Sequence, residues 1–230
     1  MSKFKVGVIV GSNRRESINK ALAQALAKLG DRHFTFSTIQ IDDLPMYNQD
    51  LELPVPQQVA RMKAAVEASD ALLFVTPEHS RSIPAVLKNA IDWGTRPWGK
   101  TNWPGKPAAV IGATPGTVGT AVAQQHLRAV LGDLGAVVMG GEAYITFKPG
   151  LVAADGSVTD DSVRGFLQTF TDDFAGLVGK LVPREQVDRK GNGHVHRRVK
   201  SISQSKPAIE GAGVKLRRAF GHRGTATCSG

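Results

Sequence analysis

Short apolar runs alternate with helix-like segments along the first 183 residues of the chain. The runs are rich in Val, Ile, Leu and Ala and nearly free of charge, which is typical of strands that a sheet buries on both faces. They predict strands over residues 5–10, 34–39, 71–75, 108–113 and 136–139. Apolar positions at helical spacing predict helices over residues 18–29, 57–69, 83–93, 118–134 and 160–181. Each predicted strand is therefore followed by a predicted helix.

Turn-forming residues separate these segments. Ser17 suits the N-cap of the first helix, Gly30 suits its end, and the Pro- and Asp-rich stretch 42–56 suits a loop. Alternating strands and helices imply right-handed crossovers and a parallel sheet covered on both faces. We predict an α/β fold with a flavodoxin-like, doubly wound sheet of five parallel strands. Ligands bind such sheets beyond the carboxyl ends of the strands, so we expect chemistry in the loops after the first, third and fourth strands.

The formal net charge of +9 is concentrated in the last part of the chain. Residues 184–230 hold 11 of the 29 Lys and Arg residues and 3 of the 20 acidic residues, which leaves 18 basic and 17 acidic side chains in residues 1–183. A nearly neutral body has no basic face that would follow a nucleic-acid backbone, so nucleic acid is not an expected partner. We predict a folded domain over residues 1–183 and a basic, irregular extension over residues 184–230.

Cysteine content and hydropathy bear on the compartment. Cys228 is the only cysteine, which excludes an internal disulfide and a thiolate metal cluster, and we expect no metal site. No stretch approaches the roughly 18 uncharged apolar residues that a spanning helix needs, and the first residues lack the apolar core of a signal peptide. We therefore expect a cytoplasmic protein without a membrane partner.

The loop after the first predicted strand, residues 11–19, has the sequence GSNRRESIN. It matches neither the GxGxxG dinucleotide motif nor the P-loop. It does combine a glycine, small polar side chains and Arg14 at a helix start, where unpaired backbone N–H groups favour an anion such as phosphate. The same spacing also fits an ordinary capped helix with solvated arginines. These residues alone leave both interpretations open.

The loop after the third predicted strand, residues 76–84, has the sequence TPEHSRSIP and leads into LKNAIDW at residues 87–93. Together the two loops resemble the NADPH-dependent FMN reductase family, whose members carry a GS-x-R-x-x-S-x-N phosphate loop and a P-E-Y-N-x-S-x-P-x-x-L-K-N-A-I-D segment. The resemblance covers roughly residues 1–183 and is greatest to the bacterial chromate, quinone and ferric reductases of that family. His79 and Ser80 depart from the pattern, because the family usually has Tyr and Asn there.

The resemblance implies an FMN site built from three loops. It places the FMN phosphate at the first loop, the isoalloxazine ring against the backbone of the second, and the other border of the ring at the loop after the fourth strand. The implied cofactor-binding residues are Ser12, Arg14, Ser17, Ile18, Asn19, Pro77, Glu78, His79, Ser80, Thr114, Pro115, Gly116 and Thr117. No catalytic acid or base is assigned, because hydride transfer to a flavin needs none when solvent reaches the reduced product.

Hydrogen bonding, packing, surface ion pairs and nucleotide binding are the roles expected of the other polar residues in and around the motif. His79 is expected to make a hydrogen bond rather than to act as a general acid. Lys88, Asn89 and Asp92 are expected to serve helix packing and surface pairs rather than ligand binding. Arg81 and Arg96 flank the flavin segment and are the candidates for the phosphates of NADH or NADPH.

The activity implied by the resemblance is that of an FMN-dependent NAD(P)H oxidoreductase. It would pass electrons to quinones, flavins, chromate or ferric chelates by a ping-pong mechanism. The alternative is a flavodoxin-type electron-transfer protein, which the nearly neutral body disfavours because such carriers are usually strongly acidic. Family members are dimers or tetramers, so the resemblance implies a homodimer or homotetramer. Trp93, Trp98 and Trp103 are candidate anchors of its interface.

Within the extension, residues 203–221 resemble the opening strands of pirin, a double-cupin protein. They contain none of the barrel that supplies metal ligands in such proteins, and a few strands cannot close a barrel alone. We expect the extension to be flexible and to take no part in flavin binding.

Overall fold

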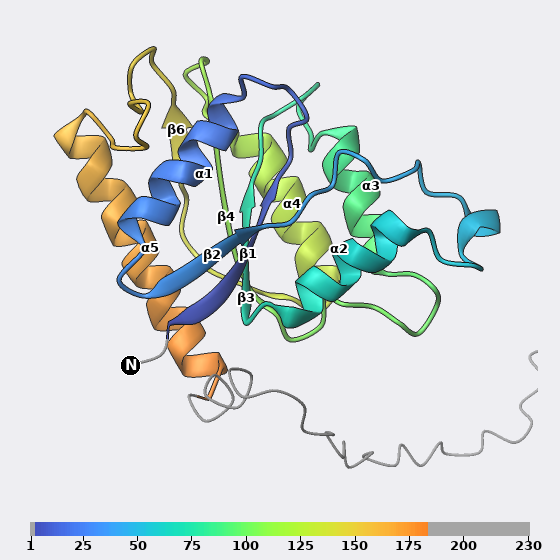
Figure 1. The fold of residues 1–230 in the computed structure, drawn as a ribbon. Helices are drawn as coiled ribbons and strands as arrows, with labels where there is room; N and C mark the ends of the chain where they lie inside the picture. Colours follow the sequence, from blue (N-terminus) through green and yellow to red (C-terminus); the bar gives the residue numbers. More distant parts are fainter. Residues whose placement is uncertain (1–2, 184–230) are drawn as a thin grey trace, which may run out of the picture. The chain divides into compact units, whose positions relative to one another are not determined.

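The computed structural model describes residues 3–183, and Figure 1 shows their fold. The extension from residue 184, with its resemblance to pirin, lies outside the described residues. The strands are β1 (Phe4–Val10), β2 (Phe34–Thr38), β3 (Ala71–Val75), β4 (Pro107–Thr114), β5 (Val137–Val138) and β6 (Tyr144–Thr146). The α-helices are α1 (Ile18–Leu29), α2 (Gln57–Ala68), α3 (Ala85–Gly94), α4 (Ala121–Asp133) and α5 (Asp161–Leu181), with a 3-10 helix at Gln49–Leu51. None of the described helices is both long enough and apolar enough to cross a bilayer.

The predicted parallel sheet of five strands is confirmed, with one addition. The strand order is β2-β1-β3-β4-β5, and every pairing is parallel. The additional strand, β6, pairs with residues 112–114 of β4, whereas β5 pairs only with residues 107–108. β5 and β6 thus divide one edge of β4 between them. The sequence pattern did not reveal β6, because a strand of three residues is too short to show a period.

Helices cover both faces of the sheet, with α1 and α5 on one face and α2, α3 and α4 on the other (Figure 1). β3 is buried at all five positions, as a continuous apolar run predicts for a central strand. On one face Leu26 of α1 and Phe174 of α5 join a cluster with Phe34, and on the other Met62 and Leu87 pack in a second cluster. The two clusters together form the core that holds the strands, and so the loops that follow them, in place.

Two of the three candidate interface tryptophans belong to the core. Trp93 and Trp103 are 1% and 0% exposed. Their indole N–H groups donate to the carbonyl oxygens of Pro45, at 2.8 Å, and Ile91, at 3.0 Å. The prediction was wrong for these two residues because an indole whose N–H finds a partner packs inward like any large apolar side chain. Trp98 is 83% exposed and remains a candidate.

The loop between β2 and α2 is fixed on α3 by a side-chain amide. Asn89 Oδ1 accepts a hydrogen bond from Tyr47 N–H at 2.7 Å, and Asn89 Nδ2 donates to the Pro45 carbonyl at 3.0 Å. Lys88 and Asp92 form a surface ion pair at 2.8 Å, one helical turn apart. These three motif residues therefore have the packing and surface roles that were predicted for them.

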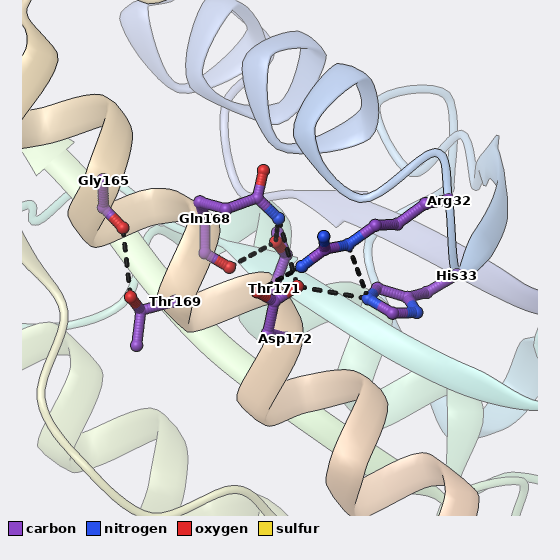
Figure 2. Close-up of polar contacts among 7 residues, drawn as sticks. All are labelled: Arg32, His33, Gly165, Gln168, Thr169, Thr171 and Asp172. Carbon is purple, nitrogen blue, oxygen red and sulfur yellow. Dashed lines mark hydrogen bonds and ion pairs between the residues drawn. The ribbon is translucent and has the colours of Figure 1, made fainter.

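A polar network attaches α5 to the start of β2 (Figure 2). Arg32 pairs with the Asp172 carboxylate at 2.5 Å, His33 Nε2 lies 3.1 Å from the same carboxylate, and Gln168 donates to it at 3.1 Å. The hydrogen bond from Arg32 is the main cause that holds the pKa of Asp172 below its ordinary value. The network lies where β2 begins, at the end of the sheet opposite to the loops that follow the strands.

Candidate active site

The loops after β1, β3 and β4 meet at one end of the sheet. The strands are parallel and in register, with Val10 beside Val75 and Val75 beside Ile111. The pairing continues beyond the strands, since Gly11 N–H donates to the Val75 carbonyl and Thr76 N–H to the Ile111 carbonyl, both at 2.9 Å. β1 and β3 are the strands between which the chain order reverses, the position at which doubly wound sheets bind ligands.

The loop after β1 presents the start of α1. Ser17 is the N-cap of this helix, as predicted, and its hydroxyl oxygen accepts a hydrogen bond from Asn19 N–H at 3.2 Å. Ser12, at the start of the same loop, is half-buried, and Arg14 is exposed. Within residues 3–183 no carboxylate pairs with Arg14. Its guanidinium is therefore available to an anion at the positive end of the helix.

The side chain of Asn19 is buried and binds β4 rather than lying on the loop surface. Its buried amide donates from Nδ2 to the Ala113 carbonyl at 2.9 Å and accepts from Ala113 N–H through Oδ1 at 2.9 Å. The two bonds tie the start of α1 to the end of β4, one residue before Thr114. The Asn19 side chain thus supports two of the three loops from within the fold.

Residues 79–82 form a tight turn in the loop after β3. His79 N–H donates to the Ser82 carbonyl at 3.0 Å, and Ser82 N–H donates to the His79 carbonyl at 2.9 Å. The two central residues, Ser80 and Arg81, have φ angles of 50° and 61°, in the left-handed region that favours Gly and Asn. Serine therefore occupies a position where the family's usual asparagine has less strain. His79 and Ser80 are both exposed.

The Glu78 side chain extends from this turn to α4. It is 9% exposed, and its Oε2 accepts a hydrogen bond from Ala123 N–H at 3.1 Å. Its Oε1 accepts from Arg81 Nη1 at 3.0 Å. The Glu78 carboxylate is therefore bound within the protein, and the contact predicted for this residue is that of the turn's backbone with the ring.

Glycine is required at two positions around the loop after β4. A Cβ on Gly112 would lie 2.0 Å from the Thr76 carbonyl oxygen and 2.3 Å from Thr120 Oγ1, so no side chain fits there. Gly119 has a φ of +65°, and its Cβ would lie 2.6 Å from Tyr144 Cβ. Residues 115–118 between these close contacts are exposed. They form a surface of small residues that a flat ring can approach.

The two arginine candidates for NAD(P)H have different surroundings. Arg81 is 70% exposed in the tight turn. The Arg96 guanidinium lies 5.7 Å from the ring centroid of Tyr47, 5.6 Å from that of Trp98, and 3.8 Å from Glu52. Tyr47 also donates a hydrogen bond to Glu52 at 2.8 Å, and this bond is the main cause that raises the pKa of the phenol. Arg96 is therefore the more firmly positioned of the two cations.

The chemistry of these groups fits FMN. A phosphate requires cationic and hydroxyl donors at a helix N-terminus, which Arg14, Ser12 and the start of α1 supply. The isoalloxazine ring requires small side chains and exposed backbone on its borders, which the 79–82 turn and residues 114–117 supply.

Comparison with known proteins decides the family. A family model described as NADPH-dependent FMN reductase matches residues 4–149, a range that contains all three loops. The chain belongs to this family. A 2-hydroxy-1,4-benzoquinone reductase from Burkholderia sp is 46% identical over 176 residues, which cover 76% of this chain and 96% of the relative. A quinone reductase from Pseudomonas putida is 43% identical over 178 residues, which cover 76% of this chain and 95% of the relative.

A solved structure gives the same result. FerB, a flavoenzyme NAD(P)H:(acceptor) oxidoreductase from Paracoccus denitrificans, is 47% identical and superposes with a TM-score of 0.75, covering 77% of this chain and 98% of its own. Membership of the NADPH-dependent FMN reductase family confirms the predicted oxidoreductase activity with FMN and NAD(P)H. The contact of each individual residue with FMN remains a prediction.

The sequence does not reveal which side-chain contacts two of the motif residues make. Asn19 and Glu78 stand in the FMN motifs, and both use their side chains to join the loops to other elements. No local sequence signal identifies such a role, because the partners lie 94 and 45 residues away along the chain.

Proposed function

We propose that this enzyme takes hydride from NAD(P)H and delivers electrons to quinones, with free flavins, chromate and ferric chelates as further acceptors, the two substrates alternating at one exposed face. Two relatives that are 46% and 43% identical to the chain are quinone reductases by name. Bound FMN supplies the chemistry, because a flavin accepts a hydride and passes electrons on singly or in pairs. The observation that carries the proposal is the convergence of the three loops at the switch point of the sheet.

Each loop has a separate task in this proposal. Arg14, Ser12, Ser17 and the start of α1 hold the phosphate, with Ile18 beside it. Pro77 to Ser80 and residues 114–117 border the ring on two sides and keep it accessible to solvent, which supplies and removes protons. Arg81 and Arg96 are the cations for the phosphates of NADH or NADPH.

The proposal extends to assembly and location. A homodimer or homotetramer is supported by large apolar side chains near Arg96 that remain exposed, namely Met46, Leu53 and Trp98. A cytoplasmic location is supported by the use of NAD(P)H, which is supplied inside cells.

Steady-state kinetics with NADPH and 1,4-benzoquinone test the alternating mechanism. If both substrates use one face in turn, double-reciprocal plots at several fixed quinone concentrations are parallel. Intersecting lines would show that both substrates are bound together and would overturn the proposed mechanism.

A further inference from the structure

The tight turn at residues 79–82 is held by α4 at both of its ends. We propose that Glu78 is a positioning residue which, with the Ser82–His126 contact, clamps this turn on α4 and so sets the turn's backbone against the flavin. The inference rests on the proposed placement of FMN between the turn and residues 114–117. In this inference the Glu78 side chain acts on the cofactor indirectly, by binding α4 and so fixing the backbone of the turn.

The first point of the clamp is a helix cap supplied from a distant loop. Thr120, the N-cap residue of α4, makes no side-chain capping bond. Ala123 is the third residue of the helix, and its N–H is one of the groups that a helix start leaves without an intrahelical partner. Glu78 Oε2 accepts this hydrogen bond at 3.1 Å. The carboxylate also lies at the positive end of the helix, where negative charge is favoured.

The second point lies one turn further along the same helix. Ser82 Oγ is 3.1 Å from His126 Nδ1. Ala123 and His126 are three residues apart, so they share one face of α4. Glu78, the residue before the turn, and Ser82, its last residue, are thus both bound to one face of α4.

The backbone of the turn explains why a clamp is needed. Ser80 and Arg81 both have positive φ, although neither is Gly or Asn. Such conformations persist only where the surroundings fix them, and they are common where a ligand must be met by a defined backbone. The Glu78–Arg81 ion pair adds less to this, because its Arg81 side is 70% exposed and solvated ion pairs are weak. When the clamp is removed, the turn can relax away from the ring.

Three variants of the full chain separate the cap from other roles of Glu78. Glu78→Ala removes the acceptor, whereas Glu78→Gln keeps an acceptor oxygen for Ala123 N–H and loses the charge. Asp160→Ala is the matched control, because Asp160 caps α5 in the same way through a 3.0 Å bond from Val163 N–H. FMN affinity is measured by quenching of flavin fluorescence, and amide hydrogen exchange at His79 and Ser82 is measured without added FMN.

We expect Glu78→Ala to weaken FMN binding by roughly fivefold to tenfold, the usual range for a lost cap, and to speed exchange at Ser82. Glu78→Gln and Asp160→Ala should remain within about threefold of the wild type in affinity.

Unchanged exchange and affinity in Glu78→Ala, or equal losses in the Ala and Gln variants, would overturn the inference. If Glu78→Ala does not fold, Ser82→Ala tests the other end of the clamp. We expect a smaller loss of FMN affinity and a smaller increase in exchange for this variant. No change in either measurement would contradict the clamp. Failure of the wild type to bind FMN would instead contradict the proposed function, and hydrogen exchange would still test the clamp.

Discussion

Asn19 and Ala113 exchange two hydrogen bonds of 2.9 Å, which join the start of α1 to the end of β4. Both residues are buried, so loss of the amide leaves a backbone N–H and a carbonyl without partners. We expect Asn19→Ala to lower the free energy of unfolding by about 2 to 3 kcal/mol and to weaken FMN binding, because two of the three loops lose their link. Urea unfolding and FMN titration measure the two effects.

Asn48→Ala is the control for this substitution. Asn48 is an exposed asparagine that accepts one backbone hydrogen bond, from Asp50 N–H at 3.1 Å. Its loss should lower the free energy of unfolding by about 1 kcal/mol or less, the usual cost of a single cap, and leave FMN affinity unchanged. A comparable loss in both variants would mean that the Asn19–Ala113 link has no special importance.

Arg14 and Arg15 are adjacent, exposed and without carboxylate partners in the described part of the chain. Only Arg14 matches the arginine of the phosphate motif. We expect Arg14→Ala to weaken FMN binding roughly tenfold or more, since a charge-assisted bond to a phosphate contributes about 1.5 to 3 kcal/mol. Arg15→Ala should have a much smaller effect. Equal effects of the two substitutions, measured by flavin titration, would show that the phosphate lies elsewhere.

The Asp172 network makes stability depend on pH in the acid range. The pKa of Asp172 is lower in the folded than in the unfolded chain, so its carboxylate stabilises the fold above the unfolded value, and the stabilisation is lost as pH falls through the folded value. We expect Asp172→Asn to lower the free energy of unfolding by about 0.5 to 1 kcal/mol at pH 6, a difference that shrinks below about pH 4.

Urea unfolding at several pH values between pH 3 and pH 7 measures this difference, with Asp173→Asn as the control. Asp173 is the next residue on α5 and is exposed. Its substitution should leave the unfolding curve nearly unchanged at every pH. A difference between wild type and Asp172→Asn that stays constant down to the most acid condition would contradict the assigned pKa.

The predicted boundary of the folded domain leads to a truncation experiment. All residues assigned to FMN lie between Ser12 and Thr117, and the last described helix ends at Leu181. We expect a chain ending at Pro183 to fold, to bind FMN and to oxidise NADPH at rates within about twofold of the full chain. Loss of flavin or a change of oligomeric state in the shorter chain, measured by absorbance and gel filtration, would make the extension part of the enzyme.

The main features of the fold could be predicted because its signals are local. β3 is five consecutive apolar residues, and Ser17 and Gly30 stand at the ends of α1. β6 escaped prediction because its three residues form a strand only by pairing with the end of β4. The five predicted strands, the last of them over residues 136–139, therefore omit β6.

The sequence predicted which loops form the candidate site, but it predicted the contacts of their side chains less well. A motif indicates which loops are candidates for the flavin site, but the partner of a side chain depends on tertiary contacts. Asn19 reaches Ala113 and Glu78 reaches Ala123, across 94 and 45 residues. The burial of Trp93 and Trp103 is likewise decided by hydrogen-bond partners that no local pattern shows. These contacts appear only once the chain has folded.

The most direct test of the account is an anaerobic titration of the FMN-loaded full chain with NADPH, followed by absorbance. Hydride transfer before any acceptor binds predicts that about one equivalent of NADPH per bound FMN bleaches the flavin absorbance. Addition of 1,4-benzoquinone after removal of the oxidised nucleotide should then restore it. Flavin absorbance that stays unchanged until quinone and NADPH are present together, or a protein that takes up no FMN, would contradict the account.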